Sequence, residues 1–172
     1  MSPQIITDEF LLNLIYRLRW DVLNKLGVSS SVYPKGVVRD PQDAIGTHWA
    51  IISDGDLLAG ARLSLHLTAS DLPSPYYFTP AAGRLPPPIG SMNRLFVVPP
   101  ARRHGFSAQL DGVRLAEAER LGCRSVVLFV HQLSGASRLR AALSHGFECL
   151  FPVDSVHDPL WGGFGTPLFK LL

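Results

Sequence analysis

Hydrophobic residues fall three or four positions apart between Leu11 and Val22, which is the spacing of one face of an α-helix. This pattern predicts a helix over about residues 8–26, and Gly27 ends it. Arg19 lies within this segment, and the simplest interpretation is a surface arginine on an amphipathic helix. The chain therefore opens with a helix that packs one face on the rest of the molecule.

Two apolar stretches then flank a turn. Residues 48–52 and 57–67 read as strands, and Asp54-Gly55 between them is a strong hairpin signal. Residues 68–90 predict an irregular segment, because eight of the 14 prolines lie between positions 73 and 100. This segment contains Tyr76-Tyr-Phe78, so we expect it to be packed rather than disordered.

The second half of the chain alternates strands and helices. We expect a strand over 94–98, helices over 105–121 and 137–144, and strands over 125–130 and 168–171. A strand-helix-strand unit implies a parallel pair with a right-handed crossover. These elements predict an α/β fold with a mixed sheet in a single domain spanning 1–172. On the helix over 105–121 we expect Asp111 and Arg114 to face outward and Ala116 inward.

Composition narrows the possible functions. The 172 residues are 47% hydrophobic and 17% charged with a formal net charge of +2, which gives no reason to expect nucleic-acid binding. Two cysteines are too few for a disulfide scaffold or a tetrahedral zinc site, so we expect no metal. Neither a secretory signal nor an apolar run of membrane-spanning length is apparent, and a cytoplasmic protein is the expectation.

One short segment carries recognisable chemistry. A strand ends, a basic loop Arg102-Arg-His-Gly-Phe-Ser107 turns, and a helix begins. The free backbone N–H groups and partial positive charge of a helix N-terminus bind phosphate, and Gly105 allows a ligand close to the backbone. The segment is thus either a diphosphate site or a plain basic turn before a surface helix.

This loop resembles the Arg/Gln-x-x-Gly-x-Gly/Ala pyrophosphate loop of the GNAT superfamily of N-acyltransferases, with Ser107 at its last position. The stretches 95–99, 121–128 and 140–147 also resemble the superfamily's fourth strand, its helix-to-strand step and its closing helix with a Gly-Phe turn. The resemblance implies a single-domain GNAT-like fold, a central twisted mixed sheet flanked by helices, with splayed strands 4 and 5.

The resemblance also implies a reaction and a donor site. An amine attacks the thioester of acetyl-CoA or another acyl-CoA directly, and a backbone N–H near residues 96–98 polarises the carbonyl. Pantetheine would lie between the splayed strands, and a small-molecule amine would be the acceptor. The implied coenzyme A residues are Leu95, Phe96, Val97, Val98, Arg102, Arg103, His104, Gly105, Phe106 and Ser107.

The sequence departs from the superfamily pattern at both proton-handling positions. A Glu is common on the fourth strand, where this chain has Ser91-Met-Asn-Arg94, and the usual Tyr acid is replaced by Ala142. Positioning alone supplies much of the rate for a reactive thioester. These departures also leave open a GNAT-like acyl-CoA-binding module without turnover.

Other motifs resemble the acyl-homoserine-lactone and N-acyl amino acid synthases. These motifs are Leu18-Arg19 in the first helix, the pair Asp40 and Asp43, Arg62-Leu63, the Pro-rich insertion, and Arg94. The resemblance implies a polar cluster near the acceptor, from which Arg94, Asp43 and Arg62 are the catalytic candidates. Structural ion pairs are the alternative for Arg94 and Arg62, and Asp43 could be a solvated loop acid or pair with an arginine.

The donor and the acceptor stay open at this stage. Synthases of this branch often take acyl groups from an acyl carrier protein, whereas the Arg102–Ser107 loop favours coenzyme A. His66 and His131 could reach a cleft as bases, although satisfied structural histidines are commoner. Tyr76–Phe78 and Trp161–Phe164 could line an acyl pocket or fill the core. Neither the acceptor amine nor the oligomeric state follows from the sequence.

Overall fold

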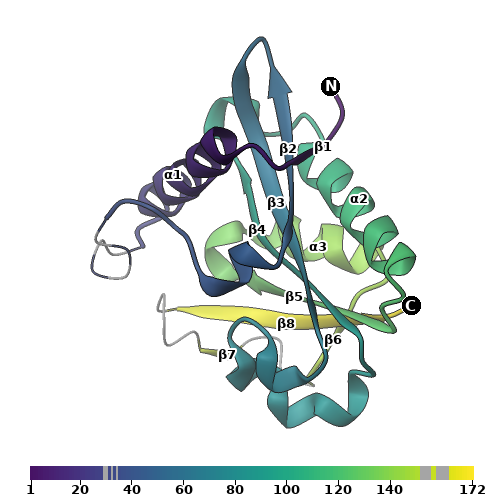
Figure 1. Cartoon of the computed structure of the whole chain (residues 1–172). Coiled ribbons are helices and arrows are strands. Elements are labelled where there is room, and N and C mark those ends of the chain that lie inside the picture. Colours follow the sequence, from purple (N-terminus) through teal and green to yellow (C-terminus); the bar gives the residue numbers. More distant parts are fainter. Residues whose placement is uncertain (29–30, 32, 34, 152–155, 158–162) are drawn as a thin grey trace. The chain divides into compact units, whose positions relative to one another are not determined.

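The computed structural model describes residues 1–28, 31, 33, 35–151, 156–157 and 163–172. Its α-helices are α1 (Glu9–Lys25), α2 (Phe106–Arg120) and α3 (Ala136–Ser144). The strands, seen in Figure 1, are β1 (Gln4–Ile6), β2 (Thr47–Ser53), β3 (Asp56–His66), β4 (Ile89–Val97), β5 (Ser125–His131), β6 (Glu148–Cys149), β7 (Val156–His157) and β8 (Phe164–Leu171).

Eight strands form one mixed sheet in the order β1-β2-β3-β4-β5-β8-β6, with β7 paired to β8. β1 and β2 are antiparallel, as are β2 and β3, whereas β4 and β5 are parallel through Ile89–Ser91 and Ser125–Val127. The predicted α/β fold class with a mixed sheet and flanking helices is therefore confirmed. The short strand β1 was not predicted, because three residues carry too little periodicity.

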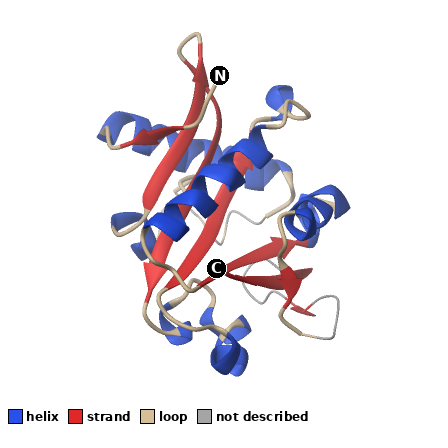
Figure 2. Cartoon of the chain, turned by 90° about the vertical axis from the view of Figure 1, so that its right-hand side faces the viewer, coloured by secondary structure: helices blue, strands red, loops and turns tan. Residues whose placement is uncertain are grey.

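The chain divides into two compact units, of which the first comprises Met1–Ser64 and Met92–Ala116. Helix α1 and the first turns of α2 lie on opposite faces of β2 and β3 (Figures 1 and 2). Asp8 caps α1 by accepting from the Leu11 amide at 2.9 Å. One core cluster of this unit comprises Ile6, Ile15, Tyr16, Val22, Ala50, Leu57 and Phe96.

The second unit comprises Leu65–Ser91 and Glu117–Leu172. Its proline-rich segment forms three 3-10 helices, Ala69–Asp71, Pro75–Tyr77 and Thr79–Arg84, instead of an irregular loop. Tyr77 and Phe78 are buried in the core of this unit, and the Tyr77 ring stacks on Phe129 at 4.2 Å between centroids. The segment is thus packed, as predicted, although Tyr76 is half exposed.

Two strands begin earlier than predicted. β4 starts at Ile89 rather than 94, directly after the Pro86–Pro88 run, and β8 starts at Phe164 rather than 168. The prediction began β4 too late because prolines mark the end of regular structure, and it missed that Pro88 immediately precedes the strand. The turn at Asp54-Gly55 has φ of 53° and 86°, so both residues adopt the left-handed conformation expected of this hairpin.

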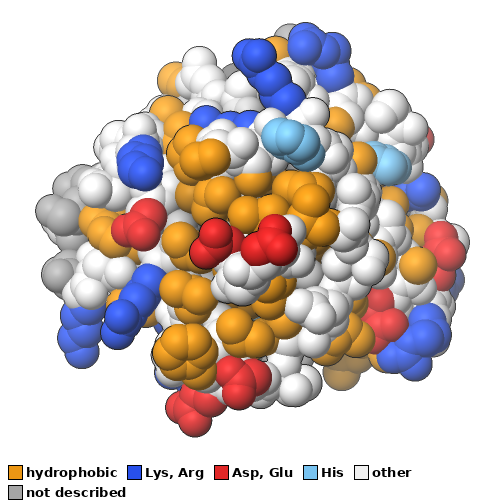
Figure 3. Space-filling model, turned by 90° about the horizontal axis from the view of Figure 1, so that it is seen from above, with side chains coloured by type: hydrophobic (Ala, Val, Ile, Leu, Met, Phe, Trp, Pro, Cys, Tyr) orange, Lys and Arg blue, Asp and Glu red, His pale blue; other side chains and the backbone are white. Residues whose placement is uncertain are grey.

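The face seen in Figure 3 looks down on the end of the molecule that carries the β2–β3 turn, where Asp54 and Asp56 are exposed. Acidic side chains interrupt the hydrophobic ones over this face, and basic side chains lie toward its margins. No helix within the described ranges is long and apolar enough to cross a membrane.

Candidate functional site

The basic loop lies between β4 and α2, where the sequence analysis expects it. A short 3-10 turn, Pro99–Ala101, follows β4, and the Gln109 amide donates to the Gly105 carbonyl at 3.1 Å as α2 begins. Gly105 has φ +76° and nothing within 4 Å of the position a Cβ would take. Its conformation therefore demands glycine, and the open space beside it leaves the backbone accessible to a ligand.

The polar side chains of the loop point to solvent. Arg102, Arg103 and His104 are exposed, Ser107 is partly buried, and Phe106 is buried and anchors the start of α2. The His104 Nδ1 lies 3.0 Å from the Arg102 carbonyl, which accepts its proton, and the ring stacks near Phe106. The first-turn amides of α2, which have no partner within the helix, thus share an exposed loop with two arginines.

The stretch of β4 expected to bind pantetheine leads into this loop. Phe96 is buried beneath Gly60, where a Cβ would come within 2.7 Å of the Phe96 ring. The Val98 amide donates to the Leu58 carbonyl at 2.9 Å. Backbone groups of successive residues in a strand point to opposite sides, so the Val97 amide points away from β3. Val97, rather than Val98, is therefore the candidate to polarise an acyl carbonyl.

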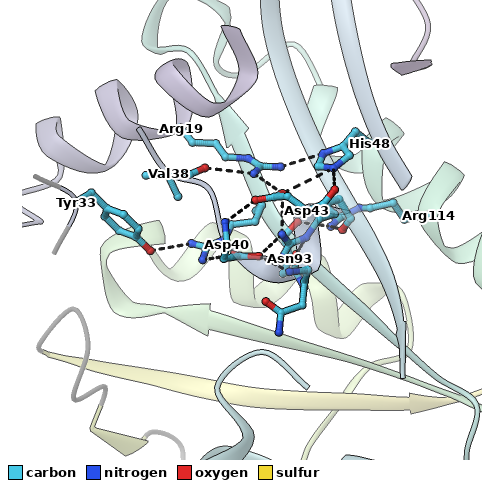
Figure 4. Close-up of polar contacts among 11 residues, drawn as sticks. Arg19, Tyr33, Val38, Asp40, Asp43, His48, Asn93 and Arg114 are labelled. Carbon is cyan, nitrogen blue, oxygen red and sulfur yellow. Dashed lines mark hydrogen bonds and ion pairs between the residues drawn. The ribbon is translucent and has the colours of Figure 1, made fainter. Parts of the chain in front are cut away.

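A second group of functional candidates forms a buried cluster of ion pairs in the same unit, shown in Figure 4. Its centre is Asp43, whose carboxylate oxygen Oδ1 lies 2.8 Å from Arg19 Nη1 and 2.7 Å from Arg62 Nη1. The side chains of Asp43 and Arg62 are completely buried. One carboxylate thus joins two arginines that are 43 residues apart in the sequence.

Asp40 extends the cluster toward the surface. Its carboxylate accepts from Arg62 Nη1 and from Arg94 Nε, the latter at 2.8 Å, and Arg94 also donates to the Tyr33 hydroxyl. Asp40 and Arg94 are 16% and 15% exposed, so they form the outer edge of the cluster. The Asp40 amide donates to Asp43 Oδ2 at 2.8 Å, and this capping box fixes the two carboxylates relative to each other.

His48 completes the cluster and was not predicted. Its Nδ1 lies 3.2 Å from Arg19 Nη2, and its Nε2 lies 3.1 Å from the Asp43 carbonyl oxygen. Since a guanidinium only donates and a carbonyl only accepts, this geometry fits a neutral ring with its proton on Nε2. Burial lowers the pKa of His48 and, with the charge of Arg19, favours the same neutral form.

The ionised cluster carries one excess positive charge. Burial raises the pKa of Asp40, but the charges of Arg94 and Arg62 outweigh it and bring that pKa to about 2. The pKa of Asp43 is likewise lowered against the effect of burial by Arg19 and Arg62. Burial lowers the pKa of Arg19 to about 10, so this arginine stays charged near neutral pH. Three arginines thus face two carboxylates and a neutral histidine.

Gly46 makes room for this arrangement. A Cβ at Gly46 would lie 2.7 Å from Arg62 Cδ and 2.9 Å from the Gln42 carbonyl oxygen. Neither of these atoms is the free end of a flexible side chain, because the head of Arg62 is held by Asp40, Asp43 and Asn93. A glycine is therefore needed here for close approach rather than for an unusual backbone conformation.

The expected side-chain direction is wrong for four residues. Arg19 is 2% exposed and paired with Asp43, not on the surface. Asp111 and Arg114, expected to face outward, are buried and 2.5 Å apart, whereas Ala116 is exposed. Arg19 lies four residues after Ile15 and three before Val22, so helical spacing already placed it on the buried face. A charged residue at such a position signals a buried ion pair.

The other candidate residues lie outside both the basic loop and the buried cluster. His66, His131 and Cys123 are buried, and burial raises the pKa of the Cys123 thiol. Ala142, at the place of the usual acid, is buried. Trp161 lies outside the described residues, and Phe164 is 47% exposed. Within the described part of the chain, no three His, Cys, Asp or Glu side chains gather as a metal site.

Solved structures resemble this chain in fold. FeeM, an N-acyl amino acid synthase from uncultured soil microbes, matches with a TM-score of 0.72 and 10% identity over 99% of this chain and 90% of that one. BjaI, a CoA-dependent acyl-homoserine lactone synthase solved with SAM and isopentyl-CoA, matches at 0.68 and 19% identity over 94% and 77%. An acetyltransferase from Bacillus subtilis in complex with CoA matches at 0.61 and 13% identity over 99% and 98%.

No protein-family model matches the chain, and no curated protein matches its sequence. The structural likenesses, all below 25% identity, establish the fold, and that fold is the one found in GNAT N-acyltransferases. The resemblance drawn from the sequence is therefore confirmed for the fold. The similar structures include both an acetyltransferase and synthases, so the fold does not separate the two.

Proposed function

We propose that this protein is an N-acyltransferase that moves an acyl group from an acyl-CoA to a primary amine. The observation that carries the proposal is the exposed loop at the start of α2. There Gly105 is open on its Cβ side, and Arg102 and Arg103 are exposed beside the first-turn amides. These groups would bind the diphosphate of coenzyme A, with the Ser107 hydroxyl as a further donor.

The reaction would be direct attack within this fold. The amine nitrogen would form a bond to the thioester carbonyl carbon while the carbon–sulfur bond breaks, and the proton lost by nitrogen would end on water or on the coenzyme A thiolate. The Val97 amide would donate to the carbonyl oxygen as it gains charge. With Ala142 in place of the usual acid, the good leaving-group character of the thiolate and the positioning of the two reactants would supply most of the rate.

A thermal-shift series tests the donor site. Free coenzyme A and its acetyl, butyryl, octanoyl and palmitoyl thioesters should each raise the midpoint of unfolding, since a ligand that binds only the folded state stabilises it by mass action. Arg103→Glu should reduce these shifts, because it reverses the charge of an exposed loop residue. Arg17→Glu, which makes the same change at an exposed arginine of α1, is the control and should leave them unchanged. If none of the thioesters raises the midpoint of unfolding, the proposed donor site is wrong.

The buried cluster supports a second, narrower candidate, a synthase-like acyltransferase with an amino-acid-type acceptor. Arg19, Asp40, Asp43, Arg62 and Arg94 are brought together, and the cluster carries one excess positive charge. The partly exposed Arg94 is where an incoming carboxylate would balance that charge. FeeM is described as an N-acyl amino acid synthase, and BjaI was solved with SAM. Arg94, Asp43 and Arg62 would then orient the acceptor.

Donor and acceptor screens separate the two candidates. The synthase-like reading predicts rates that rise from acetyl to octanoyl donors and amino acids that react faster than the corresponding decarboxylated amines. Its long-chain donor would be either an acyl-CoA or an acyl carrier protein, so both are assayed. Faster transfer of acetyl groups, to amines with and without a carboxylate alike, would favour an ordinary acetyltransferase.

A further inference from the structure

Arg114 links helix α2 to the backbone of two strands and has no part in the chemistry proposed so far. Its side chain is fully buried. Nε donates to the Leu110 carbonyl at 3.1 Å, and Nη2 pairs with Asp111 at 2.5 Å, so its own helix orients the guanidinium. Nη1 then lies 3.3 Å from both the Arg62 carbonyl of β3 and the Asn93 carbonyl of β4 (Figure 4).

The second of these carbonyls lies next to an unusual point in the backbone. Arg94, which follows Asn93 within β4, has φ +55°, a left-handed conformation that non-glycine residues rarely adopt. Such a residue persists where its surroundings hold it in place. Its side chain is held by Asp40 and Tyr33, and the peptide before it is held by Arg114.

The same point joins the two proposed sites. Residues 95–98, expected to bind the thioester, directly follow Arg94, whereas Arg62 and Arg94 belong to the buried cluster. The Asn93 side chain also accepts from Arg62 Nε at 2.7 Å. A shift of the Asn93–Arg94 peptide would therefore move the proposed thioester-binding backbone relative to the cluster.

We propose that Arg114 is a positioning residue, whose guanidinium holds the Arg62 and Asn93 carbonyls and so fixes the course of the backbone from Arg94 to Val98. Its place in catalysis rests on the proposed acyltransferase function. The diphosphate loop lies at the start of α2, two turns before Arg114, whereas the hydrogen bonds described above join Arg114 to Leu110, Asp111 and the two strands. Loss of Arg114 should therefore slow acyl transfer without weakening coenzyme A binding.

Two variants test this while keeping the protein folded. Arg114→Lys keeps the charge opposite Asp111 but lacks the planar fork that reaches both carbonyls. The double variant Asp111→Leu/Arg114→Met removes the buried pair together, which avoids an unpaired buried charge. The matched control is Glu117→Gln/Arg120→Gln, which removes an exposed ion pair of the same spacing on the same helix.

The readouts are amide hydrogen exchange at residues 95–98, the kcat and KM of acyl transfer, and the Kd for coenzyme A. We expect both Arg114 variants to speed exchange of the Val98 amide and to lower kcat about tenfold or more, with the Kd within about twofold of wild type. The control should change none of these values. Unchanged exchange at residues 95–98 would overturn the proposal, and so would an equal increase in β2, which signals only a general loss of stability.

The exchange measurement does not depend on catalysis. If the wild-type protein transfers no acyl group, the proposed function fails, and faster exchange confined to residues 95–98 still supports the role of Arg114 in holding β4. If wild-type transfer is observed and both variants retain its kcat, Arg114 has no positioning role in the reaction and the proposal is wrong.

Discussion

The basic loop at Arg102–Ser107 and the buried cluster around Asp43 are both rich in arginine, but they use it in opposite ways. Arg102 and Arg103 are exposed, and their charge is available to a ligand. Arg19 and Arg62 are buried, and their guanidinium groups bond Asp40, Asp43, Asn93 and His48, with only Arg19 Nε left unpaired among the buried side-chain atoms of the described residues. An exposed arginine can bind a ligand, whereas a buried arginine that is hydrogen-bonded on several sides positions other groups of the protein.

Stability should therefore depend on the cluster and ligand affinity on the loop. The largest expected effect is that of Asp43→Ala, which leaves Arg19 and Arg62 buried without their shared partner. We expect a loss of about 3–5 kcal/mol in the free energy of unfolding, measured by urea denaturation. Glu117→Ala, which breaks the exposed pair with Arg120, is the control and should cost under about 1 kcal/mol. Equal effects of the two changes would remove the distinction between cluster and surface.

Gly46→Ala tests the packing around Arg62 without removing a charge. The new methyl group would overlap Arg62 Cδ and the Gln42 carbonyl, so either the guanidinium or the 3-10 turn at Pro41–Ala44 must move. Overpacking of this kind costs about 1–3 kcal/mol. Gly83→Ala, where a Cβ meets nothing within 4 Å, should change the unfolding midpoint much less. A neutral Gly46→Ala would mean that Arg62 is held less tightly than its contacts indicate.

Arg103→Glu should have the opposite effect to the cluster variants: it should weaken coenzyme A binding and leave the free energy of unfolding nearly unchanged. Reversing the charge at an exposed loop residue should weaken coenzyme A binding by about tenfold or more, whereas surface changes usually shift stability by less than about 0.5 kcal/mol. Titration calorimetry on Arg103→Glu and on the Arg17→Glu control measures the first quantity. Unchanged affinity in a folded Arg103→Glu protein would remove Arg103 from the proposed site.

The smallest effect concerns pH. Because burial lowers the pKa of His48 from 6.5, the unfolded chain binds this proton more readily than the folded one. The contribution of His48 to the free energy of unfolding is therefore fully present above pH 6.5 and is lost as the pH drops toward the folded-state pKa. Asp40, with its pKa lowered from 3.8 to about 2, adds a further loss only below about pH 4. In His48→Gln the loss of stability as the pH drops below 6.5 should be smaller than in the wild type. An unchanged loss would mean that another group titrates in this range.

The difference between loop and cluster also decides what could be predicted from sequence. The loop is contiguous, and the glycine that bends it and the arginines that flank it are neighbours in the chain, so local reasoning located it. The cluster joins residues from α1, the Pro41–Ala44 turn and its cap, β2, β3 and β4, and a single sequence does not say which arginine meets which aspartate. Its members were named only through a resemblance, and His48 had no motif to mark it.

Buried charge is the recurrent reason for errors of side-chain direction. Arg114 follows Leu110 by four residues and precedes Ala118 by four, and all three are buried, so its spacing matched the apolar face of α2. The prediction placed Arg114 and Arg19 on the surface because they are charged, although their helical spacing placed them on the buried face. The fold class, by contrast, depends on element order and on the β4-to-β5 crossover, which the apolar pattern determines well.

The function proposed for this protein is transfer of an acyl group from an acyl-CoA to an amine. It is tested most directly by following release of the free coenzyme A thiol from acetyl- and octanoyl-CoA, with and without a panel of amines and amino acids. We expect thiol release that depends on the amine, is matched by an equal amount of amide in mass spectrometry, and falls in Arg103→Glu. Thiol release that is the same with and without every amine, at the rate of the protein-free solution, would contradict it.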